Sequence, residues 1–118
     1  MVGEAGPSIL VVEDDASLRM VCRVTLELEG FDVGEAETVA SARAAVAARR
    51  PSLVFLDLHL GGNPADHLLD ELRDAGIAVV IVSGASELDV YAERASAVIV
   101  KPFDPATLVA AARRFAVG

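Results

Sequence analysis

Short apolar runs recur along the chain and divide it into alternating candidate strands and helices. Four of these runs are continuous and rich in β-branched residues, and they lie at residues 9–12, 53–56, 77–82 and 97–100. Continuous apolarity without polar alternation predicts strands that are covered on both faces, as in a parallel sheet. A fifth candidate, residues 31–35, alternates between apolar and polar positions, which predicts a strand at the edge of the sheet.

Helical segments follow the candidate strands, at approximately residues 16–29, 38–49, 65–75, 86–95 and 105–115. Gly30 and Gly76 come directly after two of these segments and are typical C-terminal stops. Asp104 and Pro105 open the last segment as a favourable N-cap and first-turn pair. Five strands are too few for an eight-stranded barrel, so the order predicts an open, doubly wound α/β sheet. We expect one domain over residues 8–116, preceded by an N-terminal tail, residues 1–7.

Composition and charge exclude several classes of function. The chain has 118 residues, of which 53% are apolar, enough for one domain with a core. Ten Lys and Arg residues against eighteen Asp and Glu residues give a net charge of −8, which argues against binding to nucleic acid or to a membrane surface. No apolar stretch approaches the ~18 residues of a membrane span. The single Cys22 excludes an internal disulfide and favours a cytoplasmic location.

Polar residues that could carry chemistry follow directly after the candidate strands. They are Glu13 and Asp14, Asp57, Ser83 and Lys101, the only lysine of the chain. Because the carboxyl ends of parallel strands share one rim, where ligands bind in open α/β sheets, we expect these side chains to meet. Carboxylates held together repel one another unless a cation lies between them, and oxygen ligands of this kind suit Mg²⁺. A hydroxyl and an ammonium suit phosphoryl oxygens, and a carboxylate can act as a nucleophile toward phosphorus.

Four segments, in this order, resemble the receiver domain of two-component response regulators. They are residues 11–14 (VVED), 55–58 (FLDL), 80–84 (VIVSG) and 100–103 (VKPF), and the resemblance covers essentially the whole chain. It implies a flavodoxin-like (βα)₅ fold with strand order 2-1-3-4-5. It implies a phosphoacceptor signalling domain, not a turnover enzyme, served by a sensor histidine kinase or a histidine phosphotransfer protein. Output would be a contact with a downstream protein, without nucleic acid or membrane.

The resemblance also implies a role for each polar residue of the rim. Asp57 is the implied phosphoacceptor, and Ser83 and Lys101 are the implied ligands of the phosphoryl oxygens. The implied Mg²⁺ ligands are Glu13 (through water), Asp14, Asp57 and the backbone carbonyl of His59. Pro102 follows Lys101 through what is a cis peptide bond in the family, and Gly84 matches a position where a small residue admits the phosphoryl group.

Three departures from the family pattern concern how the phosphorylated state is read out. Val98 occupies a position that is usually Tyr or Phe in the family. The stretch from Ser83 to Lys101 is about one helical turn short, and we expect the shortfall in the fourth helix, which is part of the family's usual output face. Residues 60–62 read Leu-Gly-Gly where the family usually has Leu-Pro-Gly. We therefore expect intact phosphorylation chemistry, with activation carried by loop movements around residues 58–64 and 83–87.

Other interpretations of these residues are weaker. A receiver-like interaction module that is not phosphorylated would not need the complete polar set. A phosphohydrolase with an aspartyl nucleophile usually carries a second Asp two residues later, where this chain has His59. Asp15 fits a helix cap better than a metal ligand. A metal pair of His59 and His67 has no further support in the sequence.

Overall fold

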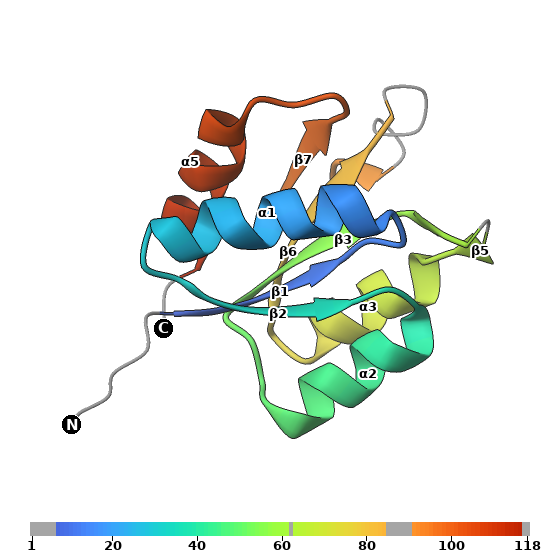
Figure 1. Ribbon diagram of the computed structural model, residues 1–118. Coiled ribbons are helices and arrows are strands. Elements are labelled where there is room, and N and C mark those ends of the chain that lie inside the picture. The colour runs from blue at the N-terminus through green and yellow to red at the C-terminus, as the bar shows by residue number, and fades with distance from the viewer. Residues whose placement is uncertain (1–6, 62, 85–90, 117–118) are drawn as a thin grey trace.

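A five-stranded parallel sheet forms the centre of the computed structural model, which describes residues 7–61, 63–84 and 91–116 (Figure 1). The strands are β1 (Ser8–Val12), β2 (Asp32–Ala36), β3 (Leu53–Asp57), β6 (Ala78–Ser83) and β7 (Ala97–Val100). Their spatial order is β2-β1-β3-β6-β7, which confirms the flavodoxin-like order 2-1-3-4-5 and places β2 at an edge. The labels differ only because a small hairpin, β4 (His59–Leu60) with β5 (Asn63–Pro64), follows β3.

Helices cover both faces of the sheet (Figure 1). On one face lie α1 (Ala16–Leu28) and α5 (Pro105–Phe115), and on the other lie α2 (Val39–Ala48) and α3 (Asp66–Asp74). Half of the expected helix at residues 86–95 lies outside the described residues, and its described half, from residue 91, consists mostly of turns that lead into β7. Within the described part of the chain, no helix is both long and apolar enough to cross a membrane.

Two buried clusters, one on each face of the sheet, explain the continuous apolar runs. Successive residues of β3 contribute to opposite clusters: Val54 and Leu56 pack toward α2 and α3, whereas Leu53 and Phe55 pack toward α1 and α5. All four are at most 1% exposed. Cys22 belongs to the second cluster, and its burial raises the pKa of the thiol to about 11, as expected of a structural core cysteine.

The ends of the helices follow the capping rules only in part. Asp15 caps α1, accepting hydrogen bonds from the backbone N–H groups of Ser17 and Leu18, which confirms its interpretation as a cap. Gly30 has a φ of 94°, a left-handed conformation that glycine adopts without a steric penalty. Asp104 occupies the N-cap position of α5 with Pro105 after it, but its side chain makes no capping hydrogen bond. The expected N-cap and first-turn positions of Asp104 and Pro105 are therefore confirmed, and the backbone carbonyl of Asp104, not its side chain, accepts from the first turn.

Candidate functional site

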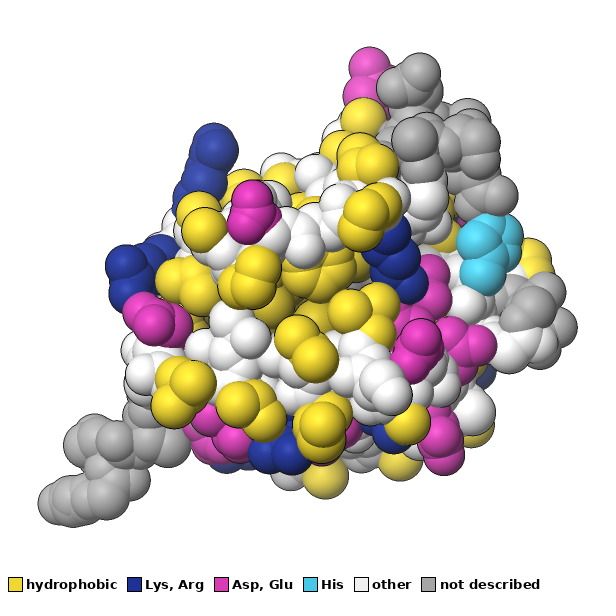
Figure 2. All heavy atoms as spheres, turned by 45° about the horizontal axis from the view of Figure 1, so that its top comes forward, with side chains coloured by type: hydrophobic (Ala, Val, Ile, Leu, Met, Phe, Trp, Pro, Cys, Tyr) yellow, Lys and Arg dark blue, Asp and Glu magenta, His cyan; other side chains and the backbone are white. Residues whose placement is uncertain are grey.

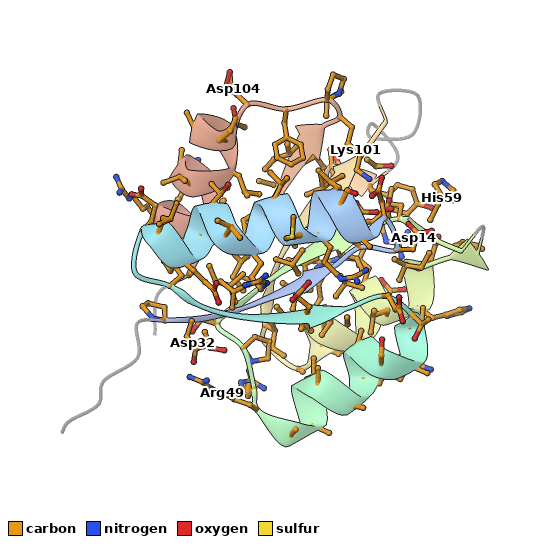
Figure 3. All side chains as sticks on the ribbon, in the orientation of Figure 1. Asp14, Asp32, Arg49, His59, Lys101 and Asp104 are labelled. Atoms are coloured by element: carbon orange, nitrogen blue, oxygen red, sulfur yellow. The ribbon has the colours of Figure 1, made fainter. Side chains whose placement is uncertain are left out.

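The expected polar residues meet at the carboxyl-terminal rim of the sheet. Figure 3 places Asp14, His59 and Lys101 together at this end of the molecule, opposite to Asp32 and Arg49. Carboxylate oxygens of Glu13, Asp14 and Asp57 lie within 4.8 Å of one another. Glu13 and Asp57 are buried, whereas Asp14 is exposed, so the cluster opens to solvent on the Asp14 side.

Lys101 follows the edge strand β7, and its side chain reaches the carboxylates. Its Nζ donates to Glu13 Oε1 at 2.7 Å and to Asp57 Oδ2 at 3.4 Å. The backbone N–H of Lys101 donates to the carbonyl of Ser83 at 2.8 Å, and Ser83 itself is 4% exposed. The Lys101–Pro102 peptide bond is cis, as the resemblance implies. The ends of β6 and β7 thus bring a hydroxyl and an ammonium to the same rim as the acids.

The electrostatics of the site favour a bound cation. Burial raises the pKa of Glu13 to about 7, although the hydrogen bond from Lys101 partly offsets this effect. Burial alone would lower the pKa of Lys101, but its hydrogen bond to Glu13 and the charges of Glu13 and Asp57 raise it overall. The pKa of Asp14 is lowered, chiefly by a backbone hydrogen bond from Gly61. A second cation beside these acids would relieve the energetic cost that burial imposes on the Glu13 carboxylate.

The loop after β3 folds back over the acids. The backbone N–H of His59 donates to Asp57 Oδ1 at 3.2 Å, and that of Gly61 donates to Asp14 Oδ2 at 2.9 Å. Gly61 has a φ of 60°, so a residue with a side chain would be strained here. The His59 side chain is exposed, so its backbone is the part that lies on the site.

One contact of the site has no signal in the sequence. Arg19 lies in α1 and its Nη1 donates to the backbone carbonyl of Glu13 at 2.8 Å. Nothing in the periodicity of α1 distinguishes Arg19 from the other surface arginines, because a long side chain can reach a strand end or solvent equally well. The two histidines form no metal cluster among the described residues, where Glu13, Asp14 and Asp57 are the only group of three or more potential ligands.

Comparison with known proteins identifies the family. Residues 9–113 match the response regulator receiver domain. The chain belongs to this family, the signalling domains of two-component systems. A solved receiver domain, that of NtrX from Brucella abortus, superposes with a TM-score of 0.83 at 34% identity, covering 90% of this chain and 95% of that one.

The curated relatives are longer proteins, and this chain matches only part of each. The DNA-binding response regulator MtrA of Mycobacterium tuberculosis is 39% identical over 110 residues, which are 89% of this chain and 48% of that protein. The phosphate regulon transcriptional regulatory protein PhoB of Pseudomonas aeruginosa is 33% identical over 113 residues, 89% of this chain and 49% of that protein. This receiver domain therefore spans about half the length of the curated relatives it matches.

Proposed function

We propose that this receiver domain accepts a phosphoryl group on Asp57 from a phosphohistidine, in a reaction that requires Mg²⁺. The observation that carries the proposal is the position of Asp57. Its carboxylate lies at the rim, with oxygens of Glu13 and Asp14 within 4.8 Å and Lys101 Nζ at 3.4 Å. This arrangement combines a nucleophile, a divalent-cation site and a positive charge, which phosphoryl transfer needs together.

The transfer itself requires little of the protein beyond positioning and charge. A carboxylate oxygen of Asp57 attacks phosphorus, a P–O bond forms, and the P–N bond breaks with its electron pair returning to the donor imidazole. Lys101 donates to the phosphoryl oxygens, as does the hydroxyl of Ser83, and these contacts stabilise the charge that spreads over them. Each carboxylate oxygen of Asp57 accepts one hydrogen bond, Oδ1 from the backbone N–H of His59 and Oδ2 from Lys101 Nζ, so the nucleophile is held in place from both sides.

The acids fit Mg²⁺ by their chemistry. Three carboxylates within 4.8 Å offer only oxygen ligands, the type that this hard cation prefers. Glu13, Asp14, Asp57 and the backbone carbonyl of His59 would hold the ion. When bound, Mg²⁺ neutralises charge on the acids and on the incoming phosphoryl oxygens.

We propose that the phosphodonor binds to an apolar surface beside the site. Met20, Val21 and Val24 of α1 are between 41% and 52% exposed, and Leu28 is 80% exposed. Figure 2 shows hydrophobic side chains spread over this face. A groove in it is lined by Leu18, Val21, Thr25, Lys101, Pro102, Phe103, Pro105 and Leu108. Because Lys101 lines the groove and its Nζ lies 3.4 Å from Asp57 Oδ2, a kinase or phosphotransfer protein seated there would hold its phosphohistidine close to Asp57.

We infer that output is also a protein contact, in the cytoplasm, and that this domain itself does not bind nucleic acid. The net charge of −8 supports this inference, since phosphate backbones require cationic partners. The name of MtrA describes that longer protein as DNA-binding. A gel-shift titration of this chain with duplex DNA, in the phosphorylated and unphosphorylated states, is expected to show no complex in either.

Intact-mass measurement tests the phosphorylation. The protein is incubated with Mg²⁺ and acetyl phosphate as wild type, as Asp57→Asn, and as Asp104→Asn, a matched change at an exposed acid outside the acidic cluster. We expect one phosphoryl adduct on wild type and Asp104→Asn, and none on Asp57→Asn. An absence of adduct with any donor would support the unphosphorylated interaction module instead. Turnover of many donor equivalents without accumulation would support a phosphohydrolase.

A further inference from the structure

Arg19 connects three segments around the acidic end of β1. Besides the hydrogen bond to the Glu13 carbonyl, its Nε donates to Glu35 Oε1 on β2 at 3.1 Å, and its Nη1 lies 3.9 Å from Glu37 Oε2. The Arg19 side chain is only 16% exposed. Its guanidinium is therefore held in place by acids that do not belong to the candidate metal site.

The carbonyl that Arg19 holds controls the direction of two acids. A peptide group is planar, so the C=O of Glu13 and the N–H of Asp14 rotate as one unit. The backbone N–H of Glu13 donates to Ala36 O at 3.0 Å, which holds the same residue on its other side. Because the N–H and the C=O of Glu13 are both hydrogen-bonded, rotation of the Glu13 backbone is restricted. The peptide plane between Glu13 and Asp14 is restricted with it. Asp14 is exposed, and its direction is set by this backbone and by the hydrogen bond that its Oδ2 accepts from the backbone N–H of Gly61.

We propose that Arg19 is a positioning residue for phosphoryl transfer to Asp57, holding the Glu13–Asp14 peptide so that both carboxylates face the cation site. The inference rests on the proposed function for its importance to phosphorylation. The effect of Arg19 on Mg²⁺ binding can be measured without phosphorylation. Arg19 does not touch the reacting atoms and acts through the backbone of Glu13.

The sign of one effect separates positioning from simple charge. A cation close to a Mg²⁺ site repels the metal. If Arg19 acted only through its charge, the protein would bind Mg²⁺ more tightly once Arg19 was replaced. Loss of a positioning contact has the opposite sign, because the acids then sample directions that do not bind the ion. Contacts of this outer kind typically change metal affinity by about 10- to 100-fold.

The test is a calorimetric titration of the purified chain with Mg²⁺. Arg19→Met keeps the apolar stem and removes the guanidinium, and we expect it to weaken Mg²⁺ binding by about tenfold. Arg19→Lys, which keeps the charge and a donor, is expected to recover part of the loss. Arg43→Met is the matched control, since Arg43 forms an ion pair with Glu71 between α2 and α3, remote from the rim. It is expected to bind Mg²⁺ as wild type does.

Phosphorylation by acetyl phosphate provides the second readout. For Arg19→Met, the rate at limiting Mg²⁺ is expected to fall in proportion to the lost affinity and to recover largely at saturating Mg²⁺. Unchanged or tighter Mg²⁺ binding by Arg19→Met, with an unaltered circular dichroism spectrum, would overturn the proposal. If Arg19→Met does not fold, Arg19→Lys decides: weaker Mg²⁺ binding by this folded variant, whose charge is unchanged, supports the proposal, and wild-type affinity overturns it. A wild-type protein that binds Mg²⁺ but takes no phosphoryl group refutes the proposed function alone.

Discussion

The two halves of the rim differ in how their residues are held. In the acidic half, Glu13, Asp14 and Asp57 each accept a hydrogen bond from a backbone N–H, and they lie at the ends of two central strands. In the other half, Ser83 and Lys101 lie on β6 and in the segment after the edge strand β7, joined by a single backbone hydrogen bond at 2.8 Å. The acidic half is thus held by three backbone N–H groups, whereas the ammonium of Lys101 is held by the acids themselves.

Two of the three departures from the family pattern lie in this second half, at Val98 and in the stretch from Ser83 to Lys101. Val98 is half-buried and packs against the same cluster as Tyr91, on the side of the sheet that α2 and α3 cover. The hydroxyl of Tyr91 donates to Asp66 Oδ2 at 2.8 Å, at the start of α3. The chain therefore keeps an aromatic residue in this region, but brings it from seven residues earlier than Val98. Of the two loops expected to move, residues 58–61 lie on the site, and residues 85–87 fall outside the described residues.

The largest effect is expected at Lys101, the link between the halves. Lys101→Met removes the ammonium that would neutralise the phosphoryl oxygens while keeping most of the stem. Loss of one such preorganised donor typically costs about 10²- to 10³-fold in rate, so phosphorylation by acetyl phosphate is expected to slow by about that factor. Stopped-flow or quenched mass measurements at saturating Mg²⁺ give the rate. A change of less than threefold would place Lys101 outside the chemistry.

A pH dependence is expected from the acidic half. In the metal-free protein the pKa of Glu13 is raised to about 7, above its ordinary value of 4.5. Between these values the folded state keeps a proton that the unfolded state releases, so this contribution to stability is complete below pH 4.5 and is lost as the pH rises through about 7. Denaturant titrations in EDTA are expected to show a fall in the free energy of unfolding over this window.

Glu13→Gln isolates that contribution. The variant has no proton to release, so its stability is expected to decline less than that of wild type between pH 4.5 and 7. Added Mg²⁺ is expected to stabilise wild type more at pH 8 than at pH 5, because the ion binds the deprotonated acid. If the free energy of unfolding changes with pH in the same way for wild type and Glu13→Gln, the pH dependence does not come from Glu13.

The smallest effect is expected at Tyr91. Tyr91→Phe removes the hydrogen bond to Asp66 and keeps the ring in the cluster, so the free energy of unfolding is expected to fall by about 0.5–1.5 kcal/mol. The phosphorylation rate at saturating Mg²⁺ is expected to stay within about twofold of wild type. A large loss of rate without a loss of stability would show that the two halves are not separate in function.

Much of this architecture was predictable from the sequence because the signals were local. Residues 53–56 are continuously apolar, and both faces of β3 are indeed covered. Asp57, Ser83 and Lys101 follow their strands directly, and topology alone brings such positions together. The meeting of these residues at one rim was therefore predictable, and their roles are the subject of the proposals above.

Other features left no local signal. The β4–β5 hairpin pairs two residues with two, too short for any periodicity to show. Arg19 and Tyr91 act over long sequence separations, through side chains whose reach is set by the fold. Asp104 carries a favourable capping sequence, yet its side chain accepts no hydrogen bond from α5, because a cap requires a side-chain direction that residue type does not determine.

The most direct measurement is the chemical location of the phosphoryl group. Borohydride reduces an acyl phosphate of aspartate to homoserine, which peptide mass mapping can place at a single residue. After treatment with acetyl phosphate and Mg²⁺, we expect homoserine at residue 57 and at no other acid, and none when EDTA replaces Mg²⁺. Reduction at Glu13 or Asp14, or a phosphorylated protein that yields no reduced residue, would contradict the assignment of Asp57 as the phosphoacceptor.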